Sequence, residues 1–302
     1  MVAWENTPQD SLTAGSPGRI RLGADRLRIH VINLERRPDR RNQFMEWNGH
    51  QPLRFEFLAA ADGRRIDRAR LIEQGLLDPA DREFNNGALG NALSQLSLWQ
   101  ACAAGHQPFL VFEDDACLRG DFWRHARPLM ERYLSAHPII LFGFNTDAVT
   151  ALRGADGFVS VVRFDERIKR RPGYFRDYGK LQDVRPQLFQ CLQFWGSLAY
   201  AITPAGARAL INACFPLSSR ARIEMIGEGR SVIPCGVDGM MNVALQEGRL
   251  KVLACYPPLV LGPNSHADSD IQRLGTVGAG APDRRSHDQN VSATPARKSA
   301  AG

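Results

Sequence analysis

The chain has 302 residues, of which 44% are hydrophobic and 23% are charged, and its formal net charge is +6. These proportions are ordinary for a soluble globular protein, and the length is ample for a buried core. Acids and bases are interspersed, and no run of interleaved aromatic and basic residues resembles an RNA-binding sheet, so we expect no nucleic-acid partner. The modest positive charge suits a protein that handles anionic small molecules or rests near an anionic surface.

The six cysteines are widely scattered, and no two of them have the Cys-x-x-Cys spacing of a zinc or redox site. We therefore expect buried free thiols in a reducing compartment. The N-terminus lacks the basic start and apolar core of a signal peptide, and no apolar stretch approaches the ~20 residues that span a bilayer. These features predict a cytoplasmic protein whose contact with the inner membrane face, if made, is peripheral.

Both ends of the chain are low in apolar residues. Residues 1–26 are polar and rich in Gly, Pro, Ser and Thr, which predicts a disordered leader. Residues 274–302 are similarly polar and predict a disordered tail. No clean linker and no internal repeat interrupts the sequence between them, so we expect one domain over residues 27–273.

Strand and helix signals alternate from the start of this domain. Residues 28–34 predict a buried strand, and Pro38 is well placed to open a helix. A turn at Asp62 and Gly63 leads to a second helix around Leu71.

The next helix has the clearest boundaries. Asn85 is suited to cap it and Gly105 to end it, and its apolar residues recur at helical spacing on one face. It leads directly into a strand at residues 109–112, and residues 138–144 predict a further strand.

Two more strands are expected at residues 197–202 and 251–254. Between them, Thr203 and Pro204 supply the cap and the first residue of a helix. Strands that alternate with helices indicate an α/β fold with parallel strands, in which a ligand lies beyond the carboxyl ends of the strands.

Residues 163–185 interrupt this rhythm with many arginines and lysines around three aromatic residues. Charge runs usually lie on the surface, so one interpretation is a solvated, mobile insertion. The other is a loop that grips a phosphorylated or anionic acceptor, or that touches an anionic leaflet.

The most informative stretch is the strand at residues 109–112, which ends in Glu113, Asp114 and Asp115. Adjacent carboxylates repel one another and raise each other's pKa values, so such a cluster is unfavourable unless a cation compensates it. The alternative is a strand that simply runs into a solvated acidic turn.

Several separated segments resemble glycosyltransferase family 25, the lipopolysaccharide-biosynthesis and procollagen galactosyltransferase group. The matching segments are residues 31–41, 60–63, 87–95, 110–115, 196–200, 206–207, 237–238 and 269–271, together with Trp99. The order and spacing of these segments make the resemblance fairly specific over about residues 28–272. This chain has Ala88, Asn91 and Gln95 where the family usually has Glu, Cys and His.

The resemblance implies a GT-A type, Rossmann-like domain with a mixed, mainly parallel central sheet flanked by helices. It also implies transfer of a hexose, typically galactose, from a UDP-sugar to a bacterial glycolipid or polysaccharide. A diphosphate leaving group needs its charge neutralised, and oxygen ligands suit Mn²⁺ or Mg²⁺. We assign Asp115 as the principal metal ligand, with Asp114 beside it in the metal site, and place Glu113 near the donor's ribose or the metal's waters.

Four further residues are candidates for binding the donor. Asn33, Arg36 and Arg40 follow the first strand, where base, ribose and diphosphate would lie, although the arginines also suit an ordinary solvated helix start. Asp62 is suited either to contact the nucleotide or to close the turn beside Gly63.

A base is needed to take the proton of the acceptor hydroxyl in an inverting transferase. Asp238 is the leading candidate, and capping of the following helix is its structural alternative. Asp270 is a weaker candidate, and His266 is suited to contact metal or diphosphate or simply to be solvated.

Two other functions are alternatives to sugar transfer. The three departures Ala88, Asn91 and Gln95 fit a relative that binds nucleotide-sugar or glycan without turnover. A receiver-like signalling domain also places paired acids at a strand end, but such domains are about half this length and carry their acids after the first strand.

Overall fold

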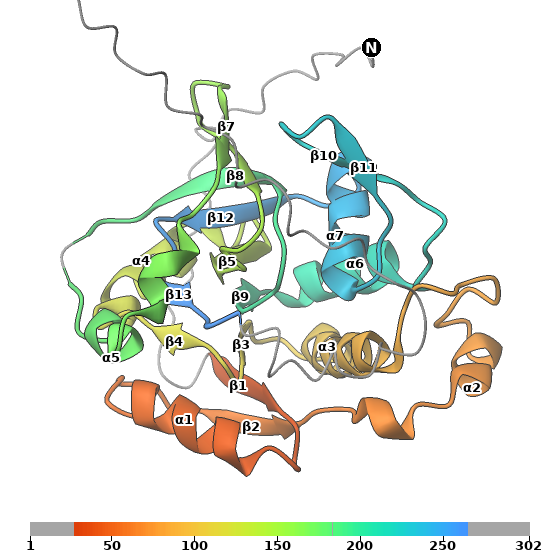
Figure 1. Cartoon of the computed structure of the whole chain (residues 1–302), viewed down its shortest axis with the longest axis horizontal. Coiled ribbons are helices and arrows are strands. Elements are labelled where there is room, and N and C mark those ends of the chain that lie inside the picture. Colours follow the sequence, from red (N-terminus) through yellow and green to blue (C-terminus); the bar gives the residue numbers. More distant parts are fainter. Residues whose placement is uncertain (1–26, 183, 265–302) are drawn as a thin grey trace, which may run out of the picture.

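A mixed β-sheet forms the centre of the protein in the computed structural model, which describes residues 27–182 and 184–264 (Figure 1). Its strands are β1 (Arg28–Asn33), β2 (Glu56–Ala59), β3 (Phe109–Glu113), β4 (Cys117–Leu118), β5 (Ile139–Gly143), β6 (Thr150–Arg153), β7 (Val159–Val162), β8 (Gln187–Gln193), β9 (Ala199–Ile202), β12 (Val252–Tyr256) and β13 (Val260–Leu261). A separate hairpin pairs β10 (Ile223–Met225) with β11 (Arg230–Val232). The helices are α1 (Pro38–Asn48), α2 (Arg68–Glu73), α3 (Asn86–Ala104), α4 (Phe122–Tyr133), α5 (Tyr174–Tyr178), α6 (Pro204–Cys214) and α7 (Val237–Gln246), with short 3₁₀ turns η2 (Gly63–Arg65) and η3 (Glu166–Arg170).

The strand order along the sheet is β2-β1-β3-β9-β5-β12-β8-β6-β7. Strands β1, β2 and β3 are parallel to one another, and β5 is parallel to β12. Strand β9 lies between β3 and β5 and runs against both, and β8 runs against β12. The α/β class and the mixed sheet are therefore confirmed, whereas the expectation of a parallel strand at residues 197–202 is wrong. Strand β9 enters the sheet from the end opposite to β3 and β5, and it runs in the same direction as β8, which itself runs against β12.

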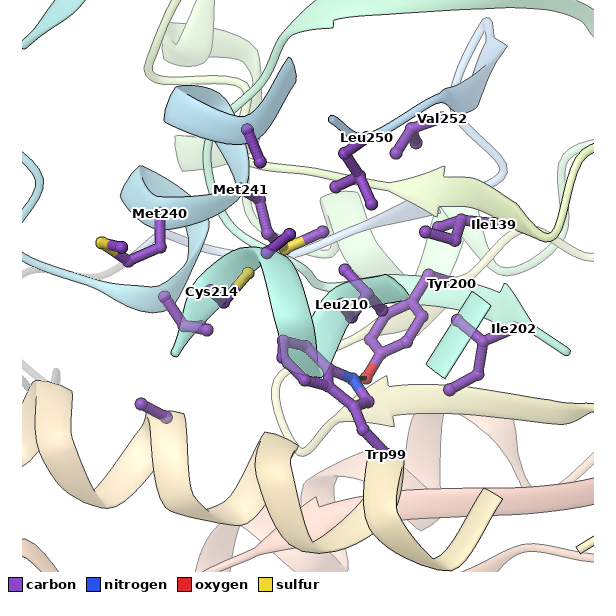
Figure 2. Close-up of a cluster of buried hydrophobic side chains, with 14 of the residues drawn as sticks. Trp99, Ile139, Tyr200, Ile202, Leu210, Cys214, Met240, Met241, Leu250 and Val252 are labelled. Carbon is purple, nitrogen blue, oxygen red and sulfur yellow. Dashed lines mark hydrogen bonds between the residues drawn. The ribbon is translucent and has the colours of Figure 1, made fainter. Parts of the chain in front are cut away.

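Helices cover both faces of the sheet. Because successive side chains of a strand point to opposite faces, Val111 packs with α3, α6 and α7, whereas Phe112 packs with α1 and α4. Figure 2 shows the first of these cores, where Trp99 of α3 and Tyr200 of β9 meet Leu210 of α6. The result is a three-layer sandwich whose strand ends remain accessible to ligands.

The predicted helix boundaries follow from local capping. The side chain of Asn85 accepts a hydrogen bond from the N–H of Ala88, and α3 ends where Gly105 follows. Thr203 caps α6 in the same way by accepting the N–H of Gly206, and Pro204 is the first helical residue. These predictions are confirmed.

Residues 163–185 combine solvated charges with buried anchors. The side chain of Arg167 is 83% exposed, as expected for a surface segment. Tyr178, however, is buried and donates a hydrogen bond to the carbonyl of Pro258, and Phe175 stacks on Trp47 with ring centroids 4.9 Å apart. The interpretation as a purely solvated insertion is therefore wrong for these aromatic residues.

Two sequence predictions concern the chain as a whole. Five of the six cysteines are buried free thiols, as expected, but Cys235 is exposed. No helix within residues 27–182 and 184–264 is long and apolar enough to cross a membrane. The predicted leader (residues 1–26), the predicted tail (residues 274–302), His266 and Asp270 lie outside the described residues.

Helix α3 approaches the Asp62 loop closely at Gly90. A Cβ atom at Gly90 would lie 2.6 Å from the carbonyl oxygen of Ala61 and 3.0 Å from the backbone nitrogen of Gly63. We expect Gly90→Ala to reduce the free energy of unfolding by about 1–3 kcal/mol, because overpacking must shift the loop or the helix. Urea denaturation measures this change.

Gly105→Ala is the matched control, because a Cβ there meets its nearest atom at 3.5 Å and the residue has an ordinary φ of −95°. We expect that variant to stay within about 0.5 kcal/mol of the parent. Equal destabilisation by the two substitutions would contradict the steric argument.

Candidate functional site

The acidic residues lie at the carboxyl end of β3, next to the carboxyl end of β1. The parallel register pairs Ile32 with Glu113, so Asn33 and Asp114 are neighbours just beyond the paired positions. The amide Nδ2 of Asn33 donates to Oδ2 of Asp114 at 2.7 Å and to the carbonyl of Arg37 at 3.2 Å. Asn33, which the sequence predicted to bind the donor, thus holds the Asp114 carboxylate in place.

Asp114 is oriented from two sides. Its second oxygen, Oδ1, lies 3.2 Å from Nη1 of Arg40, and the two side chains are only 9% and 16% exposed. Burial raises the pKa of Asp114, while the Arg40 charge and the Asn33 amide oppose that rise. With both oxygens engaged, the Asp114 carboxylate has a fixed direction at the strand end.

Asp115 has a different environment. Its Oδ1 is buried and has no hydrogen-bond partner in the described part of the chain. Burial, and then the charge of Asp114, raise the pKa of Asp115 to about 6, against the attraction of Arg40 and Lys169. A buried carboxylate oxygen without a donor is unfavourable unless a cation binds it.

Glu113 completes the acidic cluster. Its Oε1 accepts a hydrogen bond from the hydroxyl of Ser197 at 3.2 Å. Burial raises the pKa of Glu113 to about 8, and the charges of Asp115, Asp114 and Asp238 add to the effect. The three carboxyl groups therefore form one concentration of negative charge at the edge of the sheet.

Asp238 adjoins this cluster from the first turn of α7. Its Oδ2 accepts the N–H of Gly196 at 2.8 Å, and its Oδ1 accepts the N–H of Gly239 at 2.9 Å. The cap position of α7 is Gly236, so the alternative of Asp238 as the helix cap is wrong. Asp238 instead fixes the Gly196 turn, where φ is +70° and an added Cβ would lie 2.4 Å from Asn145.

Arg36 and Asp62 form a pair at the outer side of the site. Nε of Arg36 lies 3.0 Å from Oδ2 of Asp62, and their side chains are 24% and 20% exposed. Oδ1 of Asp62 accepts the N–H of Arg64 and so caps η2. The Arg64 backbone, and with it Arg36, holds the pKa of Asp62 below its usual value. The turn interpretation of Asp62 is confirmed.

Lys169 is a site residue that sequence reasoning missed. Its side chain is 7% exposed, and Nζ donates to Oγ1 of Thr146 at 2.6 Å and to the carbonyl of Gly262 at 2.7 Å while pairing with Glu166 at 2.9 Å. Burial lowers the pKa of Lys169, and its charge acts on Asp115. Within a run of surface arginines, nothing in the local sequence distinguishes this lysine.

The carboxylates supply oxygen ligands of the kind that a divalent cation takes. No group of three or more His, Cys, Asp or Glu side chains is arranged to hold a metal among residues 27–182 and 184–264. Two of the acids offer oxygen ligands. Asp115 has a buried oxygen without a partner in the described part of the chain, and Asp114 is held in a fixed orientation beside it. Mg²⁺ and Mn²⁺ are commonly held by one or two carboxylates together with substrate phosphates and water.

Comparison with known proteins identifies relatives of this chain. The model of glycosyltransferase family 25 (LPS biosynthesis protein) matches residues 26–222, which is more than half of the 302 residues. A glycosyltransferase 25 family member of Aedes aegypti is 33% identical over 125 residues, which are 38% of this chain and 21% of that protein.

Two relatives from Mus musculus are also similar. Procollagen galactosyltransferase 2 is 32% identical over 111 residues, which are 34% of this chain and 18% of that protein. Inactive glycosyltransferase 25 family member 3 is 27% identical over 197 residues, which are 61% of this chain and 28% of that protein. The matched part of this chain thus spans between 18% and 28% of the length of these three relatives.

Proposed function

The chain belongs to glycosyltransferase family 25, and on that premise we propose that it moves a hexose from a UDP-sugar to a bacterial glycolipid or polysaccharide, with help from Mn²⁺ or Mg²⁺. The hexose is galactose by analogy with procollagen galactosyltransferase 2 of Mus musculus. The observation that carries the proposal is the buried Oδ1 of Asp115, which has no hydrogen-bond partner within residues 27–182 and 184–264 and lies beside the oriented carboxylate of Asp114.

Asp115 and Asp114 would hold the cation, which when bound neutralises charge on the diphosphate leaving group. Arg40 already lies against Asp114, and Arg36 lies with Asp62 beside the end of β1. Guanidinium groups at this position are suited to bind diphosphate oxygens through paired hydrogen bonds. Glu113 would accept a hydrogen bond from a hydroxyl of the donor.

Asp238 is the proposed base that takes the proton of the acceptor hydroxyl. The position of Asp238 supports this role, because Asp238 contacts the Gly196 turn and its charge acts on Glu113. Contact of the protein with the inner membrane face, which would bring it to a lipid-linked acceptor, stays a prediction.

A thermal-shift screen of UDP, GDP and CMP sugars, each with and without Mn²⁺, tests the proposal. We expect UDP-galactose with Mn²⁺ to raise the melting temperature, because a ligand at about 100 times its dissociation constant stabilises the folded state by about 2.7 kcal/mol. GDP and CMP sugars should have little effect. A screen in which no nucleotide gives a metal-dependent shift would overturn the site assignment.

Binding without turnover is the second candidate function. One observation favours it: inactive glycosyltransferase 25 family member 3 of Mus musculus aligns over 61% of this chain. Ala88, Asn91 and Gln95 replace residues usual in the family. Release of UDP from UDP-galactose with a panel of acceptors separates the two functions, since a binding protein would show the thermal shift without UDP release.

A further inference from the structure

A buried chain of side-chain hydrogen bonds leads from helix α3 to Glu113. Nε1 of Trp99 donates to the hydroxyl of Tyr200 at 2.9 Å, and that hydroxyl donates to Oε1 of Gln95. Nε2 of Gln95 donates to Oγ of Ser197 at 3.2 Å, and Ser197 donates to Oε1 of Glu113 at 3.2 Å. We call these first four residues the relay, and Figure 2 shows its start, where the indole nitrogen of Trp99 faces the Tyr200 hydroxyl.

The chemistry of its first member sets the direction of the relay. An indole can only donate, so the Tyr200 oxygen accepts from Trp99 and its proton goes to Gln95. The Gln95 amide must then present its N–H to Ser197, which leaves the Ser197 proton for Glu113. Every step therefore runs one way, toward the carboxyl group in the site.

The relay is sealed from solvent. Trp99 and Tyr200 are 1% exposed, Gln95 is 0% exposed and Ser197 is 3% exposed. With no water to replace a lost partner, each member depends on its neighbour for its hydrogen bond. Such a network fixes side-chain orientation more firmly than a surface contact does.

The second oxygen of Glu113, Oε2, is not engaged by the relay. The relay binds Oε1, and no hydrogen bond reaches Oε2 from residues 27–182 or 184–264. Glu113 itself is half-buried, at the carboxyl end of β3 and next to the proposed cation ligands. One oxygen is thus anchored to the core, while the other has no hydrogen-bond partner among the described residues.

We propose that Gln95 and Ser197 are positioning residues that hold Glu113 so that its Oε2 accepts a hydrogen bond from a hydroxyl of the sugar donor. This inference rests on the proposed function for the identity of the donor. The hydroxyl belongs to the ribose or to the hexose, and the two sources share the same chemistry.

Gln95→Glu is the sharpest test, because it keeps the size and shape of the side chain while removing the N–H that Ser197 requires. The Ser197 proton would then go to the new carboxylate rather than to Glu113. We expect the Kd for UDP-galactose in Mn²⁺, measured by calorimetry, and its KM to rise about tenfold, with kcat changed by less than about threefold. Ser197→Ala should do the same without adding a charge.

Two variants serve as controls. Gln95→His should stay close to wild type, because a neutral imidazole also offers one donor and one acceptor. Gln193→Glu makes the same change at another fully buried glutamine, which bonds Met225 and Ile226 instead of the site, and it should leave the Kd unchanged.

A double-mutant cycle distinguishes positioning from general destabilisation. If Ser197 acts through Glu113, Ser197→Ala adds no further increase in Kd once Glu113→Gln is present. Additive losses would overturn the proposal, and so would wild-type affinity in both Gln95→Glu and Ser197→Ala. Comparing UDP with UDP-galactose locates the hydroxyl, since a ribose contact weakens both ligands and a hexose contact weakens only the sugar nucleotide.

Failure of the proposed function gives a separate result. If the wild-type protein binds neither UDP nor UDP-galactose, the assignment of a UDP-sugar donor is wrong. The positioning role of the relay is then tested by comparing crystal structures of the wild type and Ser197→Ala. A Glu113 side chain that turns away in the variant supports the positioning role. An unchanged Glu113 overturns it.

Discussion

Asp115→Asn is expected to lower kcat for hexose transfer by about a thousandfold and to abolish the Mn²⁺-dependent thermal shift with UDP-galactose. The amide keeps the size of the side chain but removes the charge from the oxygen that lacks a partner in the described chain. The free enzyme should be at least as stable as wild type, because one member of a crowded acidic cluster becomes neutral. Steady-state kinetics and thermal melts with and without Mn²⁺ measure both effects.

Asp67→Asn is the matched control for this substitution. Asp67 caps α2 by accepting the N–H of Arg70, and asparagine caps helices as well as aspartate does. That variant should keep its kcat and its metal-dependent shift. A wild-type kcat in Asp115→Asn would overturn the assignment of Asp115 as the principal metal ligand.

Stability without metal is expected to fall as the pH rises from about 4 to about 8. The pKa of Asp115 is raised from 3.8 to about 6, and that of Glu113 is raised from 4.5 to about 8. A carboxyl group whose pKa is higher in the folded state stabilises the fold below its unfolded pKa, and this contribution is lost as the pH rises through the folded value. We expect a loss on the order of 3 kcal/mol, or roughly 5–10 °C in melting temperature.

Melting curves recorded from pH 5 to pH 8.5 in a chelator measure this slope. Glu113→Gln should flatten its upper part, because the amide does not ionise. Added Mn²⁺ should restore stability mainly above pH 6, where the carboxylates are ionised and bind cations best. A melting temperature that rises with pH in the chelator would show that the acidic cluster is not the source of the pH dependence.

Local patterns predicted the fold where the physical cause is local. The cap at Asn85, the stop at Gly105 and the Thr203–Pro204 start of α6 depend on neighbouring residues, and all were predictable. The direction of β9 was not, because it depends on the insertion of this strand between β3 and β5, which lie far from it in the sequence. Propensity identifies a strand, whereas its orientation is a tertiary property.

The same division applies to the site. The acids at the end of β3 are visible in the sequence because a strand and its carboxylates are contiguous. The contact between Gln95 and Ser197 joins residues 102 positions apart, and no local pattern encodes it. One signal was present, since Gln95 lies at helical spacing from the buried Ala92 and Trp99, and a polar residue on a buried helix face needs a partner.

The central place of β9 has a consequence for how the protein is made. Strands β3 and β5 emerge from the ribosome well before residues 199–202, yet in the sheet they are joined to each other through β9, which lies between them. A nascent chain that stops before Ser197 therefore leaves the β9-facing edges of β3 and β5 unpaired and lacks the Ser197 partner of Glu113. Truncated products should aggregate rather than accumulate as folded fragments, so the acidic site forms only in chains whose translation has passed β9.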